Sequence, residues 1–156
     1  MTHSNWMGAA LAVLAALTVA DARAQAVAAE QVWVAQVKVA RGIVRIQRDE
    51  QSFPAPVGTR LKVNDTVLTG GNGAVGLMFL DNSTLSLGPE GEVVLKRFAY
   101  DPTSYMGAFD AFVKRGSVAL DAGNIAQGGA DNVRITTPQA QLSGNARQVL
   151  VNVEGK

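Results

Sequence analysis

From residue 32 onward the chain is divided into short apolar runs, each closed by Gly, Pro, Asn or Asp within about five to ten positions. The runs are rich in β-branched residues. In Val37–Val39 and Val133–Ile135 a single basic residue stands between two apolar ones. Such alternation is typical of a strand with one buried face. We expect strands at 32–40, 43–47, 66–68, 74–80, 84–87, 92–98, 108–114, 117–120, 133–136, 139–142 and 147–153.

The residues between these runs favour turns. Gly, Asn, Asp and Ser accept the backbone angles that reverse a chain, and all five prolines, at 54, 56, 89, 102 and 138, fall in the expected connections. Beyond the N-terminal apolar segment, no stretch shows extended 3.6-residue periodicity. The pattern predicts an all-β single domain of about ten short strands, either a sandwich or jelly roll or a short β-solenoid.

One local pattern occurs twice. Val39–Val44 and Val113–Val118 each contain a strand, a basic residue followed by Gly, and a second strand. Two such copies are expected of the halves of a sandwich or of successive coils of a solenoid. Chance is the alternative explanation, because strand-turn-strand units resemble one another.

The N-terminal residues have the features of a secretory signal. As a helix, the apolar run Met7–Ala20 would be about 21 Å long, shorter than the roughly 30 Å core of a bilayer. The small-x-small sequence Ala22–Ala24 suits a signal peptidase. We expect a signal-peptide helix at 1–24, a linker and the start of the first strand at 25–36, and the β domain at 37–153. The alternatives are a helix of a folded domain and an uncleaved anchor. Export implies a periplasmic or secreted location, with membrane contact only through the signal peptide.

Composition excludes most catalytic chemistry for the exported part of the chain. There is no Cys, and the one His, His3, lies in the expected signal peptide. Thiol nucleophiles, Ser–His pairs and His-bound metals are therefore not expected. The net charge of +1 also disfavours nucleic acid as a partner, because that binding depends on many basic contacts.

The remaining catalytic motifs are better explained as turns. Gly71–Gly76 spells G-x-G-x-x-G, but that motif binds a dinucleotide only where a helix begins at the loop, and here a short interrupted run follows. The acidic residues are scattered through expected turns, where Asp caps backbone N–H groups. We expect no enzyme, no catalytic residue, no metal and no cofactor.

Aromatic residues gather between Phe98 and Phe112. One interpretation is that the phenylalanines fill the core and the tyrosines lie at its rim. The other is a ligand platform formed by Tyr100, Tyr105 and Phe109, on which a sugar ring or a peptide would stack.

Several turn motifs resemble those of the ferric-citrate regulator (FecR) domain family. Gly42–Ile46 resembles its opening strand, and Gly58–Gly70 its "Gly, two residues, Leu, then Asp-x-apolar-x-Thr-Gly" element. Gly73–Pro89 resembles its central strand, Asp-Gly-Ser turn and Gly-Pro run, while Lys114–Val118 and Val133–Ala140 resemble its second strand pair and Thr-Pro-x-Ala segment. The likeness covers residues 37–153 and contains no catalytic signature. The turn positions that carry it are Gly42, Gly58, Asp65, Thr69, Gly70, Asp81, Asn82, Gly88, Pro89, Gly116, Thr137 and Pro138.

The resemblance implies a non-enzymatic β domain that serves as an interaction or assembly module in the bacterial envelope, with an envelope protein or a glycan as its partner. Asn82 stands where the family favours Gly, and Ser143–Ala146 replaces an apolar-Arg-Gly-Thr element. An anti-sigma role is not expected, because only a signal peptide is expected before the domain. A regulator or sensor in envelope signalling and a carboxylate-dependent glycan hydrolase are the alternatives.

Overall fold

The structure, a computed structural model, describes residues 32–129 and 131–155, which belong to one compact unit. The expected signal peptide at 1–24 lies outside the described residues. The strands are β1 (Ala35–Arg41), β2 (Val44–Arg48), β3 (Gln51–Pro54), β4 (Arg60–Leu61), β5 (Thr66–Thr69), β6 (Ala74–Phe79), β7 (Thr84–Leu87), β8 (Glu92–Tyr100), β9 (Gly107–Asp121), β10 (Val133–Thr136), β11 (Gln141–Gly144) and β12 (Gln148–Val153). A 3-10 helix, η1 (Asn124–Gln127), follows β9.

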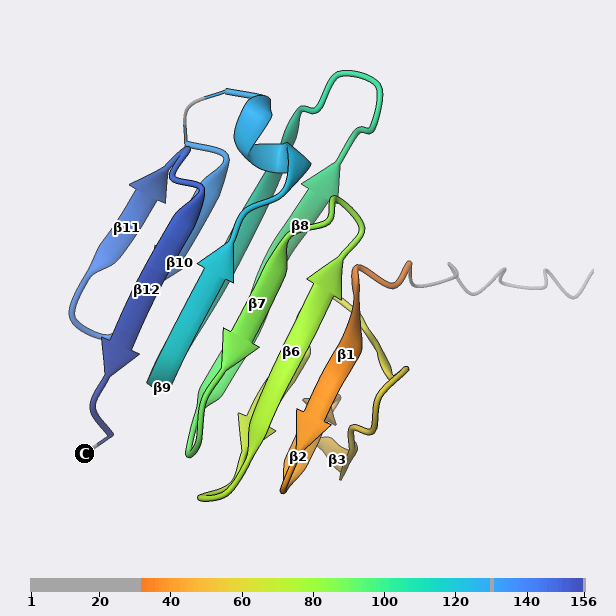
Figure 1. The fold of residues 1–156 in the computed structure, drawn as a ribbon, viewed down its shortest axis with the longest axis vertical. Coiled ribbons are helices and arrows are strands. Elements are labelled where there is room, and N and C mark those ends of the chain that lie inside the picture. The colour runs from red at the N-terminus through yellow and green to blue at the C-terminus, as the bar shows by residue number, and fades with distance from the viewer. Residues whose placement is uncertain (1–31, 130, 156) are drawn as a thin grey trace, which may run out of the picture. The chain divides into compact units, whose positions relative to one another are not determined.

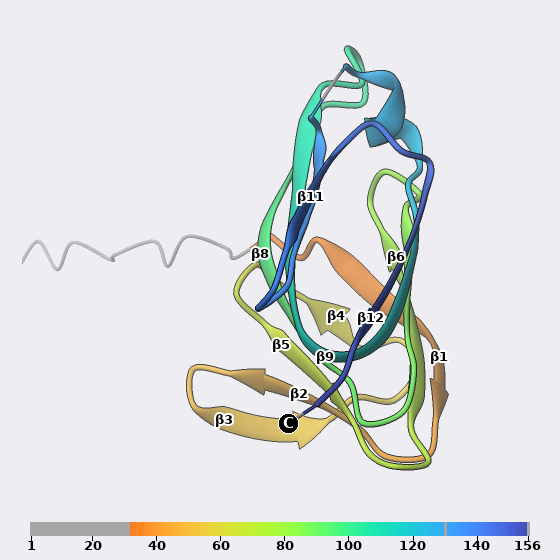
Figure 2. The ribbon, with the colours of Figure 1, turned by 90° about the vertical axis from the view of Figure 1, so that its left-hand side faces the viewer.

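The strands form one sheet that curls over on itself into two layers (Figures 1 and 2). Its order is β3-β2-β5-β8-β9-β7-β6-β1-β4, with β10 and β12 also paired to β9 and β11 paired to β10. The front layer, nearest the viewer in Figure 1, contains β4, β1, β6, β7, β12 and the second half of β9. The rear layer contains β3, β2, β5, β8, β10, β11 and the first half of β9. The all-β prediction is confirmed, in its sandwich-like form.

Alternation along the strands fills the space between the layers. In β6, Val75, Leu77 and Phe79 are buried while the residues between them are half-buried. Leu85 and Leu87 of β7 face inward in the same way, with Thr84 and Ser86 exposed. One core cluster contains buried residues from both layers. Burial of each large apolar side chain contributes about 1.5 to 3 kcal/mol, so the period-two pattern fixes which face of each strand turns inward.

The layers are joined at one end by a set of connections that we call the corner: residues 42–43, 70–73, 88–91 and 115–116. The first three link β1 to β2, β5 to β6 and β7 to β8, and each crosses from one layer to the other. At the fourth, β9 itself bends between layers (Figure 2). The two similar segments noted in the sequence, 39–44 and 113–118, therefore occupy matching places, since each carries the chain around the corner.

Several expected boundaries are corrected by the structure. The strands expected at 108–114 and 117–120 are one continuous strand, β9, because the backbone at Gly116 (φ 90°) bends without ending the pairing. Two strands, β3 and β4, were not expected, and Pro54 ends β3 instead of lying in a connection. Their short, mostly polar sequences carry little strand signal, and they form because β2 and β1 offer free edges.

Candidate interaction surfaces

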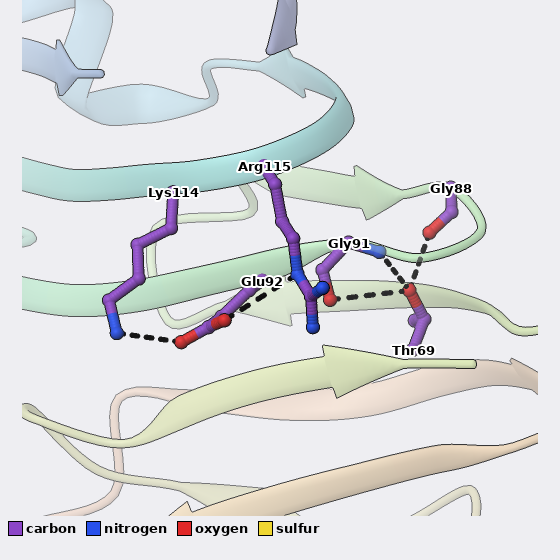
Figure 3. Close-up of polar contacts among 6 residues, drawn as sticks. All are labelled: Thr69, Gly88, Gly91, Glu92, Lys114 and Arg115. Atoms are coloured by element: carbon purple, nitrogen blue, oxygen red, sulfur yellow. Dashed lines mark hydrogen bonds and ion pairs between the residues drawn. The ribbon is translucent and has the colours of Figure 1, made fainter. Parts of the chain in front are cut away.

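Thr69 ties the corner together (Figure 3). Its side chain is buried at the end of β5. The Thr69 hydroxyl donates to the Gly88 carbonyl at 2.6 Å and accepts from the Gly91 N–H at 2.8 Å. Gly70 and Pro89 belong to the same set of turns, and the Gly70 carbonyl accepts from the Glu90 N–H. Thr69, Gly70, Gly88 and Pro89 therefore have structural roles in turns.

Glu92 lies beside the corner with two basic neighbours from β9 (Figure 3). Lys114 Nζ is 2.7 Å and Arg115 Nε 3.6 Å from its carboxylate oxygens. Both basic side chains are about half exposed, so each pair contributes roughly 0 to 1 kcal/mol. The cluster therefore holds one carboxylate between two basic side chains from β9.

Asp65 is a buried turn residue with a cationic partner. Its carboxylate accepts from the Lys62 N–H at 2.8 Å, which is the expected capping contact. It also receives two hydrogen bonds from the Arg48 guanidinium, at 2.7 and 2.6 Å. The hydrogen bond to Asp65 raises the pKa of Arg48 above its usual value. Asp65 thus links the turn before β5 to β2, a contact with Arg48 that no local sequence pattern predicts.

Asp81 connects the β6–β7 turn to η1. Its carboxylate accepts from the Ser83 N–H at 3.1 Å, from the Ser83 hydroxyl and from the Ile125 N–H at 3.2 Å. Both Asp81 and Ser83 are fully buried. Asn82, between them, has a φ of 66°, so it adopts the left-handed conformation for which Asn can replace Gly. The expected turn is confirmed, and its link to η1 is an addition.

The other turn residues of the family pattern lie at separate places. Gly58 has a φ of 94° in the loop between β3 and β4. Thr137 and Pro138 lie in the β10–β11 hairpin, where the Thr137 hydroxyl accepts from the Ala140 N–H at 2.9 Å. Gly42 and Gly116 lie at the corner. The structure therefore brings Gly42 and Gly116 to the same end of the molecule as Thr69, Gly70, Gly88 and Pro89, and it leaves Gly58, Thr137 and Pro138 elsewhere.

The expected aromatic platform is not formed. Phe109 is only 2% exposed and packs edge-on against Phe79, with ring centroids 4.9 Å apart, so it belongs to the core. The prediction that Phe109 lies on a ligand surface is therefore wrong, because the inward face of β9 places it between the layers. Tyr100 is partly buried against the core, and only Tyr105, 43% exposed, stands out on the β8–β9 loop. In the same loop the Thr103 N–H holds the pKa of Asp101 below its usual value.

Strands β11 and β12 leave open edges on the same side of the molecule (Figure 1). Among the described residues, β11 pairs only with β10 and β12 only with β9. A cavity of about 330 Å³ lies between them, lined by the core residues Val133 and Ile135, the partly buried Val149 and the 45% exposed Leu142. The layers are therefore not closed at this side.

The two opposite edges are better protected. β4 has two residues, and β3 has four and ends in a proline. Short length and Pro are ways in which proteins keep edge strands from pairing with other chains. β12 has six residues, none of them charged or Pro. It is the edge most open to pairing.

Three of the described carboxylates have structural roles. Asp65, Asp81 and Glu92 are held by the contacts above, and a glycosidase needs two carboxylates that flank the substrate across a cleft. No group of three or more acidic or His residues that could hold a metal occurs within 32–129 and 131–155. Over the same ranges no helix is long and apolar enough to cross a membrane.

Sequence reasoning missed the open edge at β12. One signal was available in the alternation of β12. Gln148, Leu150 and Asn152 share one face of this strand, and Leu150 is the apolar residue between two polar ones. Alternation predicts an exposed Leu there, and Leu150 is 83% exposed.

Comparison with known protein families, with curated proteins and with solved structures finds no match for this chain.

Proposed function

We propose that this chain is a non-enzymatic interaction or assembly module of the bacterial envelope, of the FecR-domain type, which binds an extended segment of an envelope protein along β12. The observation that carries the proposal is the unprotected edge of β12 beside an apolar cavity. Periplasmic or secreted placement belongs to the proposal and rests on the signal-like N-terminus.

Hydrogen-bond alternation shows which backbone groups of β12 are free. The Ala122 N–H donates to the Arg147 carbonyl at 2.7 Å. In an antiparallel ladder, hydrogen-bonded and non-hydrogen-bonded residue pairs alternate. This bond therefore determines which residue pairs of β12 and β9 are hydrogen-bonded. Gln148, Leu150 and Asn152, which face Asp121, Ala119 and Ser117, are the non-bonded positions. Their N–H and carbonyl groups point away from β9, toward the open side, where another strand would find them.

The adjacent cavity supplies room for side chains of such a strand. Its lining includes the apolar Val133, Ile135, Leu142 and Val149 and the polar, exposed Ser143 and Gln148. Strand addition uses main-chain hydrogen bonds for affinity and pockets for alternate side chains for specificity. The surface therefore suits an extended polypeptide with an apolar residue at every second position.

A displayed library of random heptapeptides tests this proposal. Selection against the purified protein should enrich alternating apolar sequences, whose affinity is then measured by calorimetry. Gln148→Pro removes an outward N–H of β12 and should weaken binding about tenfold, which corresponds to about 1.4 kcal/mol. Ser52→Pro is the matched control, because Ser52 holds the same outward-facing position on the opposite edge strand β3, and it should leave binding unchanged.

The other outcomes contradict the proposal. If no peptide is enriched, or if Gln148→Pro and Ser52→Pro bind equally, β12 is not the binding edge. Labelled peptidoglycan fragments are tested in parallel. Tight binding of these fragments without peptide binding would identify a glycan partner instead.

A further inference from the structure

The outer face of the front layer carries a row of residues that crosses five strands. The registers of β1, β6, β7, β9 and β12 align Val39, Gly76, Ser86, Ala119 and Leu150 in that order. Neighbouring strands are about 4.8 Å apart, so the row spans about 19 Å. Its two ends are large and exposed, at 47% for Val39 and 83% for Leu150, and its middle residues are small.

These five residues line a shallow cavity of about 720 Å³ on that face. No acidic residue lines it. Gly76 lies directly beside the exposed side chain of Val39. A Cβ at Gly76 would be 3.4 Å from the Val39 Cβ. Leu150 therefore protrudes at one side of this face. The space above Gly76, three strands away, is a hollow at the other side.

From this pairing of knob and hollow we infer that the front layer is the interface of a two-fold symmetric homodimer. An axis parallel to the strands, passing between β7 and β9, places β12 of each copy opposite β6 of the other. Leu150 then enters the hollow above the partner's Gly76, beside the partner's Val39. One symmetry operation makes this contact twice, as an isologous interface requires. It covers Leu150 and the side of Val39 that faces Gly76, and β1 lies at the rim of the interface.

The neighbouring row agrees with the same axis. It consists of Gln36, Met78, Thr84, Asp121 and Gln148, again from β1 to β12. The axis places the exposed Asp121 carboxylate opposite the hydroxyl of Thr84 in the second copy, which can donate to it. Gln148 falls opposite the partner's Met78. No two like charges meet in either row, and the layers of the two copies pack in the aligned manner of β-sandwiches.

The axis leaves the open side of β12 free. Strand binding uses the outward backbone groups of β12 and the dimer uses its side chains on the front face. Because Gln148 and Leu150 border both surfaces, Gln148→Pro and the parent are compared for peptide binding at a concentration where both have the same oligomeric state.

Sedimentation equilibrium of the protein purified from expressing cells, over about 1 to 200 µM, tests the inference. The parent should be a dimer. Leu150→Asp should raise the dimer dissociation constant at least about 100-fold, with an unchanged far-ultraviolet circular dichroism spectrum, because this side chain is 83% exposed in one copy and its loss does not disturb the fold. Leu142→Asp is the matched control on β11, outside the interface, and should remain dimeric.

Engineered disulfides test the geometry, since the chain has no Cys of its own. In the double variant Leu150→Cys with Gly76→Cys, the two positions of one copy lie about 14 Å apart, too far for a disulfide. Across the proposed interface they are adjacent. Oxidation should therefore give covalent dimers of this variant, and neither the single variants nor Leu142→Cys with Gly76→Cys should form them.

A parent that stays monomeric throughout this range overturns the inference. So does a dimer that Leu150→Asp leaves intact, or a double-cysteine variant that does not link, because the contact would then lie elsewhere.

Discussion

The buried polar residues of this protein act on its turns. Among the described residues they are Asp65, Thr69, Asp81 and Ser83, and each accepts a backbone N–H or contacts a residue that does. No buried side-chain nitrogen or oxygen in that part of the chain lacks a hydrogen-bond partner. A buried polar group left without a hydrogen-bond partner costs about 1 to 3 kcal/mol. Loop conformations that keep these hydrogen bonds are therefore favoured over conformations that break them.

Asp81→Asn should destabilise the protein although it preserves the shape of the side chain. Both carboxylate oxygens accept hydrogen bonds, one from the Ser83 N–H and the other from the Ser83 hydroxyl and the Ile125 N–H. An amide nitrogen would face a donor at one of these places. We expect a loss of about 2 to 3 kcal/mol in the free energy of unfolding, measured by urea denaturation.

The exposed Asp131 provides the control for this prediction. Asp131→Asn should change the free energy of unfolding by less than about 0.5 kcal/mol. If Asp81→Asn is equally neutral, the β6–β7 turn and η1 are not held by the carboxylate.

At the scale of the elements, the corner decides how the sheet curls. β9 passes from the rear to the front layer at Gly116, whose φ of 90° is strained for any other residue. A Cβ there would lie 2.6 Å from the Gly91 Cα, in the turn between β7 and β8. The bend of β9 therefore packs so closely against the β7–β8 turn that no space is left for a side chain at position 116.

Gly116→Ala should cost about 3 kcal/mol of stability, because it adds the strain of a positive φ to a backbone clash. Gly71→Ala is a matched substitution in another corner turn, where a Cβ would have no atom within 4 Å, and it should be nearly neutral. Thermal denaturation compares the two. Equal melting temperatures for both variants would show that the bend tolerates a side chain.

The elements also show which parts of the fold are predictable from the sequence. The turns at Asp81–Ser83 and Thr137–Ala140 were predictable, because their hydrogen bonds join residues two or three positions apart. The continuity of β9 was not, because it depends on pairing with β8 and β7, which come earlier in the chain. The burial of Phe109 and the open edge of β12 were missed for the same reason: each depends on which strands lie opposite.

At the scale of the whole molecule, β9 is the centre of the structure. It pairs with β8 and β10 along its first half and with β7 and β12 along its second, so it belongs to both layers. Ala111, Val113, Val118 and Leu120 along it are all buried. Opening β9 would separate the layers, whereas opening β11 breaks only its ladder with β10.

Native-state hydrogen exchange should follow this arrangement. The paired backbone N–H groups of β9 should exchange only through global unfolding, and so report the full free energy of unfolding measured by urea. The N–H groups of Leu142 and Gly144 on β11 should exchange through a local opening that costs several kcal/mol less, because that strand is mostly exposed and held on one side. If β11 is protected as strongly as β9, the open side of the molecule is closed in solution. Either a second chain then covers it, or β11 and β12 pair there in a way that this structure does not contain.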